Sequence, residues 1–191
     1  KLRTRDIAKD RKFYVYLPIS IALPFISTGL TFHQIFIINQ KGWTLAVLAN
    51  GFVFLGIFSI IGLMFAGPIV DKFNTQKVIL FSLFPLFLAV LTIALFDNYM
   101  ALFVYMSFLG IGWGISTPFI GSLWAELYTL ESLGTVKALL RACSVFATAL
   151  SPVIFGYMID FNYGILSLCI MSLLIISAST LLPILYQKFN D

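Results

Sequence analysis

Six apolar runs, each long enough to cross a bilayer as a helix, constrain the fold of this chain more than any other feature. A hydrocarbon core about 30 Å thick requires roughly 20 apolar residues in helical form. The expected spans cover approximately 14–38, 44–69, 78–96, 99–123, 138–159 and 164–185. The sequence therefore predicts an all-α polytopic membrane protein, with residues 1–13 as a linker and 14–191 as one six-span domain.

Composition supports a membrane protein and excludes a soluble one. The chain is 60% hydrophobic and only 10% charged, whereas soluble domains carry about 25% charged residues. The net charge of +4 does not indicate nucleic-acid binding, because the bases lie beside the spans, where they set topology. No cofactor and no metal cluster is expected from the residues present.

The distribution of Lys and Arg predicts the direction of the spans. With the amino-terminal segment in the cytoplasm, every base except Lys41 falls on the cytoplasmic side. Because Lys and Arg in short loops are retained on that side, we expect both ends of the chain in the cytoplasm, and residues 1–13 as a cytoplasmic linker. The expected location is the inner membrane of the cell.

A short motif occurs twice, at the ends of the second and fifth spans. GPIVD ends at Asp71 after Gly67, and GYMID ends at Asp160 after Gly156. The two spans run in opposite directions, so the matching motifs lie on opposite faces of the membrane. This pattern predicts two inverted three-helix repeats, an arrangement found in secondary transporters.

With this repeat, the residues resemble the carboxy-terminal half of a major facilitator superfamily transporter. The loop after the second span fits the family motif at Gly67, Asp71, Lys72 and Lys77, with Asn74 where the family prefers Gly. The segment from Trp124 to Asp160 is similar to the family's fourth-to-fifth connection and the span after it. The stretch TGLTFHQ, residues 28–34, resembles bacterial monocarboxylate and oxalate/formate carriers.

The resemblance implies a secondary transporter that moves a small solute, such as a small organic anion, by alternating access. It also implies a partner, the amino-terminal six-span half of the same protein, because members of the family bind solute between two halves. None of the expected spans carries a charge near its middle, so ion coupling is expected in that other half.

The first helix of each repeat lines the cavity in the resembled family. This implies a solute path at a set of polar and aromatic residues: His33, Gln34, Trp113, Ser116 and Thr117. For His33 an interfacial anchor is the alternative, and for Ser116 and Thr117 hydroxyl bonding to the helix backbone. Gly110 and Gly114, one turn apart on the fourth span, predict close helix packing.

The charged residues at the cytoplasmic span ends are interpreted as a gate. Opposite charges from three spans are expected to meet at one level, and Gly67 is expected to permit a close helix contact. The members are Gly67, Asp71, Lys72, Glu126, Lys137 and Arg141. Gly156 and Asp160 form the outer-face copy. The alternative is that these charges only set topology.

Two other functional classes were weighed. An intramembrane serine protease is excluded, because its nucleophile needs a His base on the last span and the one histidine, His33, is on the first. A non-transporting membrane scaffold or receptor on the same half-fold stays open. The chain is therefore not expected to be an enzyme, and solute flux separates carrier from scaffold.

Overall fold

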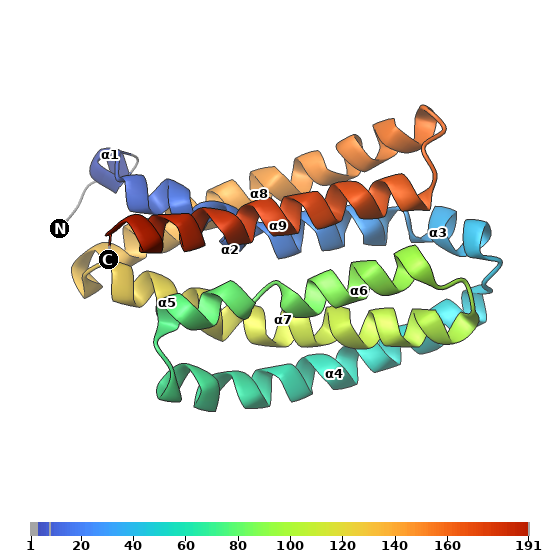
Figure 1. Cartoon of the computed structure of the whole chain (residues 1–191), viewed down its shortest axis with the longest axis horizontal. Coiled ribbons are helices and arrows are strands. Elements are labelled where there is room, and N and C mark those ends of the chain that lie inside the picture. Colours follow the sequence, from blue (N-terminus) through green and yellow to red (C-terminus); the bar gives the residue numbers. More distant parts are fainter. Residues whose placement is uncertain (1–3, 8, 191) are drawn as a thin grey trace.

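The computed structural model describes residues 4–7 and 9–190, and these form helices joined by short connections (Figure 1). The helices are α1 (Thr4–Ile7), α2 (Arg11–Phe32), α3 (Gln34–Lys41), α4 (Leu45–Lys72), α5 (Thr75–Val78), the 3-10 turn η1 (Ile79–Phe81), α6 (Phe84–Leu95), α7 (Tyr99–Leu127), α8 (Leu130–Asp160) and α9 (Ile165–Asn190).

Six helical segments of the described residues are long and apolar enough to span a membrane, which confirms the expected number. They are α2, α4, the run α5–η1–α6, α7, α8 and α9. Both ends of the chain lie at one end of the bundle, called the terminal end from here on (Figure 1). The opposite end carries α3 and is called the distal end.

The fifth span begins well before the expected residue 138. Helix α8 starts at Leu130, because Thr129 adopts the extended backbone of an N-cap and Glu131 places an acid in the first turn. The polar stretch from 130 to 137 is therefore helix, although it belongs to no apolar run. The connection between α7 and α8 shortens to Tyr128 and Thr129.

The helix contacts confirm two inverted repeats, α2–α4–α6 and α7–α8–α9. In the first repeat α2 packs on α8 and α9 of the second, and correspondingly α7 packs on α4 and α6 of the first. Equivalent helices also pack together, α2 with α7 and α6 with α9. These main contacts between the repeats are unchanged when the two repeats are exchanged, as a pseudo-two-fold axis in the membrane plane requires. Asp71 and Asp160 lie near opposite ends of the bundle accordingly.

Small residues allow α7 and α4 to approach closely, as the spacing of Gly110 and Gly114 predicted. A Cβ at Gly110 would collide with the carbonyl of Leu55, and one at Gly114 with the carbonyl of Ser59. From the other side, a Cβ at Gly62 would lie 2.8 Å from a backbone oxygen of α7. Backbone packing of this kind is the usual source of helix association in lipid.

The symmetry-related pair, α2 with α8, uses the same device at Gly29. A Cβ there would lie 2.6 Å from Ser151 Oγ and would overlap the ring of Phe155. The Ser151 hydroxyl also donates a hydrogen bond to the carbonyl of Phe25 across the helix interface. Both repeats are therefore joined by a small residue at a helix crossing.

The segment expected as a linker, 1–13, is partly packed on the bundle. Residues 1–3 and 8 lie outside the described residues, but α1 contacts α8 and Ile7 is buried. Asp10 caps α2 by accepting from the Lys12 amide at 2.9 Å, and it accepts a hydrogen bond of 2.8 Å from the Tyr128 hydroxyl. Burial raises the pKa of the Tyr128 phenol, which keeps it the donor.

At the distal end, the first and third connections are tied together. Lys41 forms an ion pair with Asp97, and its Nζ also donates to the carbonyl of Phe96 at 3.1 Å. The Trp43 indole Nε1 donates to the Asp97 carbonyl at 2.7 Å. Lys41, the one base at this end among the described residues, therefore links two loops.

Candidate functional site

A groove lined by α2, α7 and α8 brings together polar, aromatic and basic side chains from these three helices. Its volume is about 760 Å³, and it is called the polar groove below. Helix α2 contributes Ser20 and Thr28, α7 contributes Trp113, Ser116, Thr117 and Trp124, and α8 contributes Lys137, Arg141, Ser144 and Thr148. Helix α2 is the first helix of one repeat and α7 is the first helix of the other. The groove therefore lies where two symmetry-related helices pack together.

The polar groove carries positive charge. Lys137 and Arg141 are one helical turn apart on α8 and both are exposed. All residues that line the groove lie in the described part of the chain, and no Asp or Glu is among them. Two cations beside hydroxyl groups form an electrostatic environment that favours an anion.

Arg141 lies well inside α8, about three turns from its start, although short of the middle of the helix. Helix α8 has 31 residues, a length of about 46 Å, of which about 30 Å corresponds to the hydrocarbon core. Arg141 lies about 17 Å along this helix from Leu130. An ionised side chain at that depth is costly unless it faces a cavity or a partner, and Arg141 faces the polar groove.

Three of the residues predicted for a solute path line the polar groove. Trp113 is 42% exposed and lies at the middle of α7, with Ser116 and Thr117 on the next turn. Several other hydroxyls in the spans donate to a backbone carbonyl of their own helix, as in Ser107 and Thr180. Among the described residues, Ser116 and Thr117 make no such hydrogen bond. The structure therefore does not support the alternative in which the Ser116 and Thr117 hydroxyls bond to the backbone of their own helix.

The other two predicted residues, His33 and Gln34, do not line the polar groove. Helix α2 ends at Phe32, and the His33 ring Nδ1 lies 2.9 Å from the Gly29 carbonyl. Its Nε2 would lie 3.3 Å from a Cβ at Gly156, so the ring packs beside α8. Gln34 begins α3, and its Oε1 is buried without a hydrogen-bond partner among the described residues. Both belong to the distal junction of the helices.

The charges expected to form a gate do not meet in this structure. Asp71 and Lys72 end α4, whereas Lys137 and Arg141 lie on α8, and these helices occupy opposite sides of the bundle (Figure 1). Helix α4 packs on α7, and α8 packs on α2. Within the described residues no ion pair joins any two members of the expected set, which also includes Glu126 on α7. The charges stay apart because α4 and α8 are not neighbouring helices, and the early start of α8 also places both bases some turns away from the terminal end of that helix.

Gly67 also differs from its expected role. A Cβ at this position would have nothing within 4 Å, so Gly67 makes no close contact within the described chain. Asp71 and Lys72 are exposed, with the Lys72 Nζ over the Phe73 ring at 5.7 Å. On the other face, Gly156 packs beside His33, and Asp160 is exposed at the end of α8.

Sequence reasoning missed the polar stripe on α8 as a whole. Lys137, Arg141, Ser144 and Thr148 recur at helical spacing and line one groove. The sequence predicts Lys137 and Arg141 at the cytoplasmic entry of the fifth span, as gate charges, and the two hydroxyls were not singled out. The signal was present in the sequence as one polar residue per turn, continuing from the basic pair into the apolar run.

Indole and hydroxyl groups join α2 and α7 beside the groove. Trp124 is fully buried, and its ring stacks with that of Tyr128 at a centroid distance of 5.9 Å. Its Nε1 donates to Ser20 Oγ, whose own hydroxyl donates to the Tyr16 carbonyl. These bonds fix the groove wall at its terminal side.

The sequence profile of the Major Facilitator Superfamily matches residues 12–188, which is nearly the whole chain. A comparison with curated proteins found no match. The profile match agrees with the six spans, the inverted repeat and the family motif after α4. The chain belongs to the Major Facilitator Superfamily, a family of membrane transporters.

Proposed function

We propose that the chain is the carboxy-terminal half of a secondary transporter that moves a small anionic solute by alternating access. The polar groove is this half's share of the binding site. The observation that carries the proposal is the pair Lys137 and Arg141, which line a groove that holds hydroxyl and indole groups and no acid. A carboxylate or phosphate group is the ligand that an Arg fork binds best.

The proposed partner is an amino-terminal half of six spans, facing the polar groove. With the hydrocarbon core centred on α8, Arg141 would lie about 9 Å inside it and would need such a cover, because lipid offers an ionised side chain no hydrogen bonds. Solute would then bind between the halves, with Trp113, Ser116 and Thr117 of α7 and Arg141 of α8 lining the same groove. Rocking of one half against the other would expose the site to each side of the membrane in turn.

The proposed orientation places the terminal end in the cytoplasm of a cell whose inner membrane holds the protein. Apart from Lys41, the described bases lie on the terminal-side part of the bundle, and Lys9, Lys12 and Lys188 stand near its end. The proposed role of Gly67 and Asp71 is contact with the amino-terminal half. The open space beside Gly67 and the exposed Asp71 carboxylate leave that face of α4 accessible.

Transport by the full-length protein in proteoliposomes tests the proposal. Uptake of a panel of small carboxylates, phosphate esters, amines and neutral sugars should select anions. Arg141→Gln should raise the KM for the preferred anion about 10- to 100-fold, the range for loss of a charge-assisted hydrogen bond. Lys12→Gln removes the same charge from an exposed residue at the terminal end and should leave the KM unchanged.

Two results would contradict the proposal. Uptake of cations or neutral sugars in preference to anions would refute the solute class. Solute binding without flux, in a correctly inserted full-length protein, would favour the alternative, a receptor or scaffold on the same half-fold. In that case Arg141→Gln should still weaken binding, so the site and the activity are tested separately.

A further inference from the structure

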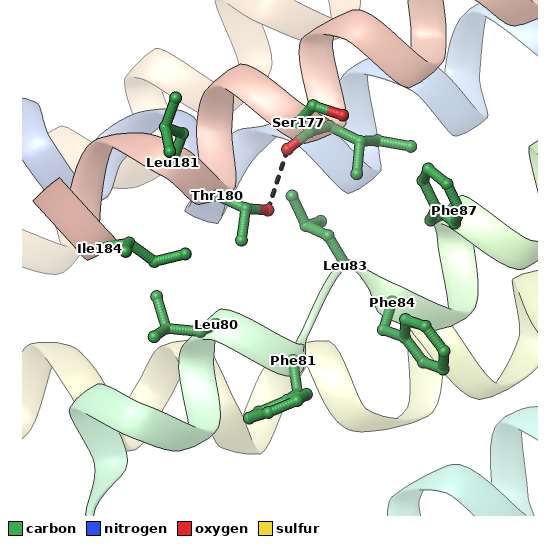
Figure 2. Close-up of a pocket in the computed structure, with 10 residues that line it drawn as sticks. Leu80, Phe81, Leu83, Phe84, Phe87, Ser177, Thr180, Leu181 and Ile184 are labelled. Carbon is green, nitrogen blue, oxygen red and sulfur yellow. Dashed lines mark hydrogen bonds between the residues drawn. The ribbon is translucent and has the colours of Figure 1, made fainter.

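A second groove lies between α9 and the run η1–α6, and it shares no residue with the polar groove. Its volume is about 490 Å³, and it is called the apolar groove here. Figure 2 shows Leu80, Leu83 and Phe87 on one side and Thr180 and Ile184 on the other. None of its lining residues, all of them described, is charged. The Thr180 hydroxyl is occupied, because it donates to the carbonyl of Ile176 at 2.9 Å.

A helix break at residues 82–83 lies beside this groove. The third span is interrupted after η1, and α6 restarts with Pro85 in its first turn. Leu83 in the break and the flanking Phe81 and Phe84 all line the groove. Phe81 and Phe84 are more than half exposed, so this side of the groove is accessible from outside the bundle.

The apolar groove lies at the depth of one lipid leaflet. Its residues on η1 and α6 are roughly 8 to 20 Å from Thr75 at the terminal end, by helical rise. Half of the hydrocarbon core is about 15 Å thick. An occupant of this groove must therefore be apolar along most of its length, as an acyl chain is.

Two lysines stand at the terminal mouth of the apolar groove. Lys188 is one turn beyond Ile184 on α9, and Lys77 is one turn before Leu80 and Phe81. Residues with this spacing share a helix face, and both lysines are exposed. The two helices are held together beside them, because Gln187 Nε2 donates to the Gln76 carbonyl at 3.0 Å.

We propose that the apolar groove and its two lysines form a binding site for an anionic phospholipid of the leaflet at the terminal end. One acyl chain lies between α6 and α9, and the phosphate group lies between the ammonium groups of Lys77 and Lys188. Basic residues that border a cleft between spans are the arrangement that recognises anionic head groups. This site is independent of the proposed solute and of the polar groove.

Native mass spectrometry of the purified full-length protein tests the site. The probes are phosphatidylglycerol and phosphatidylcholine with identical chains, titrated separately into detergent solution. The wild type should bind at least one phosphatidylglycerol more tightly than phosphatidylcholine. Each lysine near the surface contributes about 1 kcal/mol to binding of an anionic lipid. The Kd for phosphatidylglycerol should therefore rise about fivefold in Lys77→Gln and about 25-fold in the double variant with Lys188→Gln.

Matched variants separate this site from general attraction to a basic surface. Lys9→Gln with Lys12→Gln removes two exposed charges from the same end and should leave the Kd unchanged. Ile184→Trp fills the groove while both lysines stay, and it should weaken phosphatidylglycerol binding without lowering the melting temperature. Equal binding of the two lipids by the wild type would overturn the proposal. The proposal would also be overturned if the Lys9/Lys12 and Lys77/Lys188 double variants raised the Kd for phosphatidylglycerol equally. Unchanged phosphatidylglycerol binding in Ile184→Trp would overturn it as well.

Discussion

The Trp124 indole donates a hydrogen bond to Ser20 Oγ at 3.2 Å and so joins α7 to α2, the leading helices of the two repeats. Both residues are buried, with Trp124 at 0% and Ser20 at 5% exposure. Trp124→Phe removes the donor but keeps most of the ring. It should lower the free energy of unfolding by about 0.5–1.5 kcal/mol, the net contribution of one hydrogen bond.

Thermal unfolding in detergent provides the measurement, with Trp113→Phe as control. Trp113 is on the same helix but is 42% exposed and no hydrogen bond of its indole is found among the described residues. Its replacement should leave the melting temperature nearly unchanged. A larger loss in Trp113→Phe than in Trp124→Phe would contradict the assigned role of the Trp124–Ser20 bond.

Two glycine-to-alanine variants should differ in their effect on stability. Gly114→Ala places a methyl group against the Ser59 backbone, which cannot move aside without separating α4 from α7. Overpacking of this kind costs about 1–3 kcal/mol. Gly56→Ala meets nothing within 4 Å and should be neutral or stabilising, because alanine is the better helix former. Similar melting temperatures for the two variants would refute the close contact.

The orientation of the bundle can be tested by cysteine labelling in intact cells, after replacement of Cys143 and Cys169 by Ser. Asn39 and Phe73 are exposed and lie near the distal and terminal ends respectively. A cysteine at 39 should react with a membrane-impermeant maleimide added outside, and one at 73 only after permeabilisation. The reverse pattern would show that the terminal end faces outward.

Asp71 and Arg141 should act independently of one another. They lie on α4 and α8, helices that do not pack together, so the transport defects of Asp71→Asn and Arg141→Gln should add. For separated sites the coupling free energy is below about 0.5 kcal/mol. A double-mutant cycle on kcat/KM measures it. Coupling well above that value would instead support the charge network that the sequence suggested.

The architecture was predictable from the sequence because the bilayer constrains each span through that span's own residues. Each span needs only its own apolar length, and the GPIVD and GYMID motifs mark equivalent helix ends in the two repeats. The packing at Gly110 and Gly114 was also predictable, since four-residue spacing places both on one helix face.

The site was less predictable because hydropathy marks apolar runs and not helix ends. Residues 130–137 are polar yet helical, so the sequence predicts Lys137 and Arg141 at the very start of the fifth span, whereas α8 begins about two turns before Lys137. Similarly, the sequence does not show that α2 ends at Phe32, which turns His33 away from the polar groove. Which helices are neighbours decides whether charges meet, and that depends on the tertiary arrangement of the whole bundle.

Protection of a groove cysteine by solute tests the central claim most directly. In the full-length protein without other cysteines, Thr117→Cys places a thiol in the polar groove, and Phe73→Cys places one at the exposed end of α4. A saturating concentration of the transported anion should slow alkylation at 117 about tenfold or more, with no effect at 73. Equal alkylation at 117 with and without the anion, in protein that transports it normally, would contradict the assignment of the polar groove as the solute site.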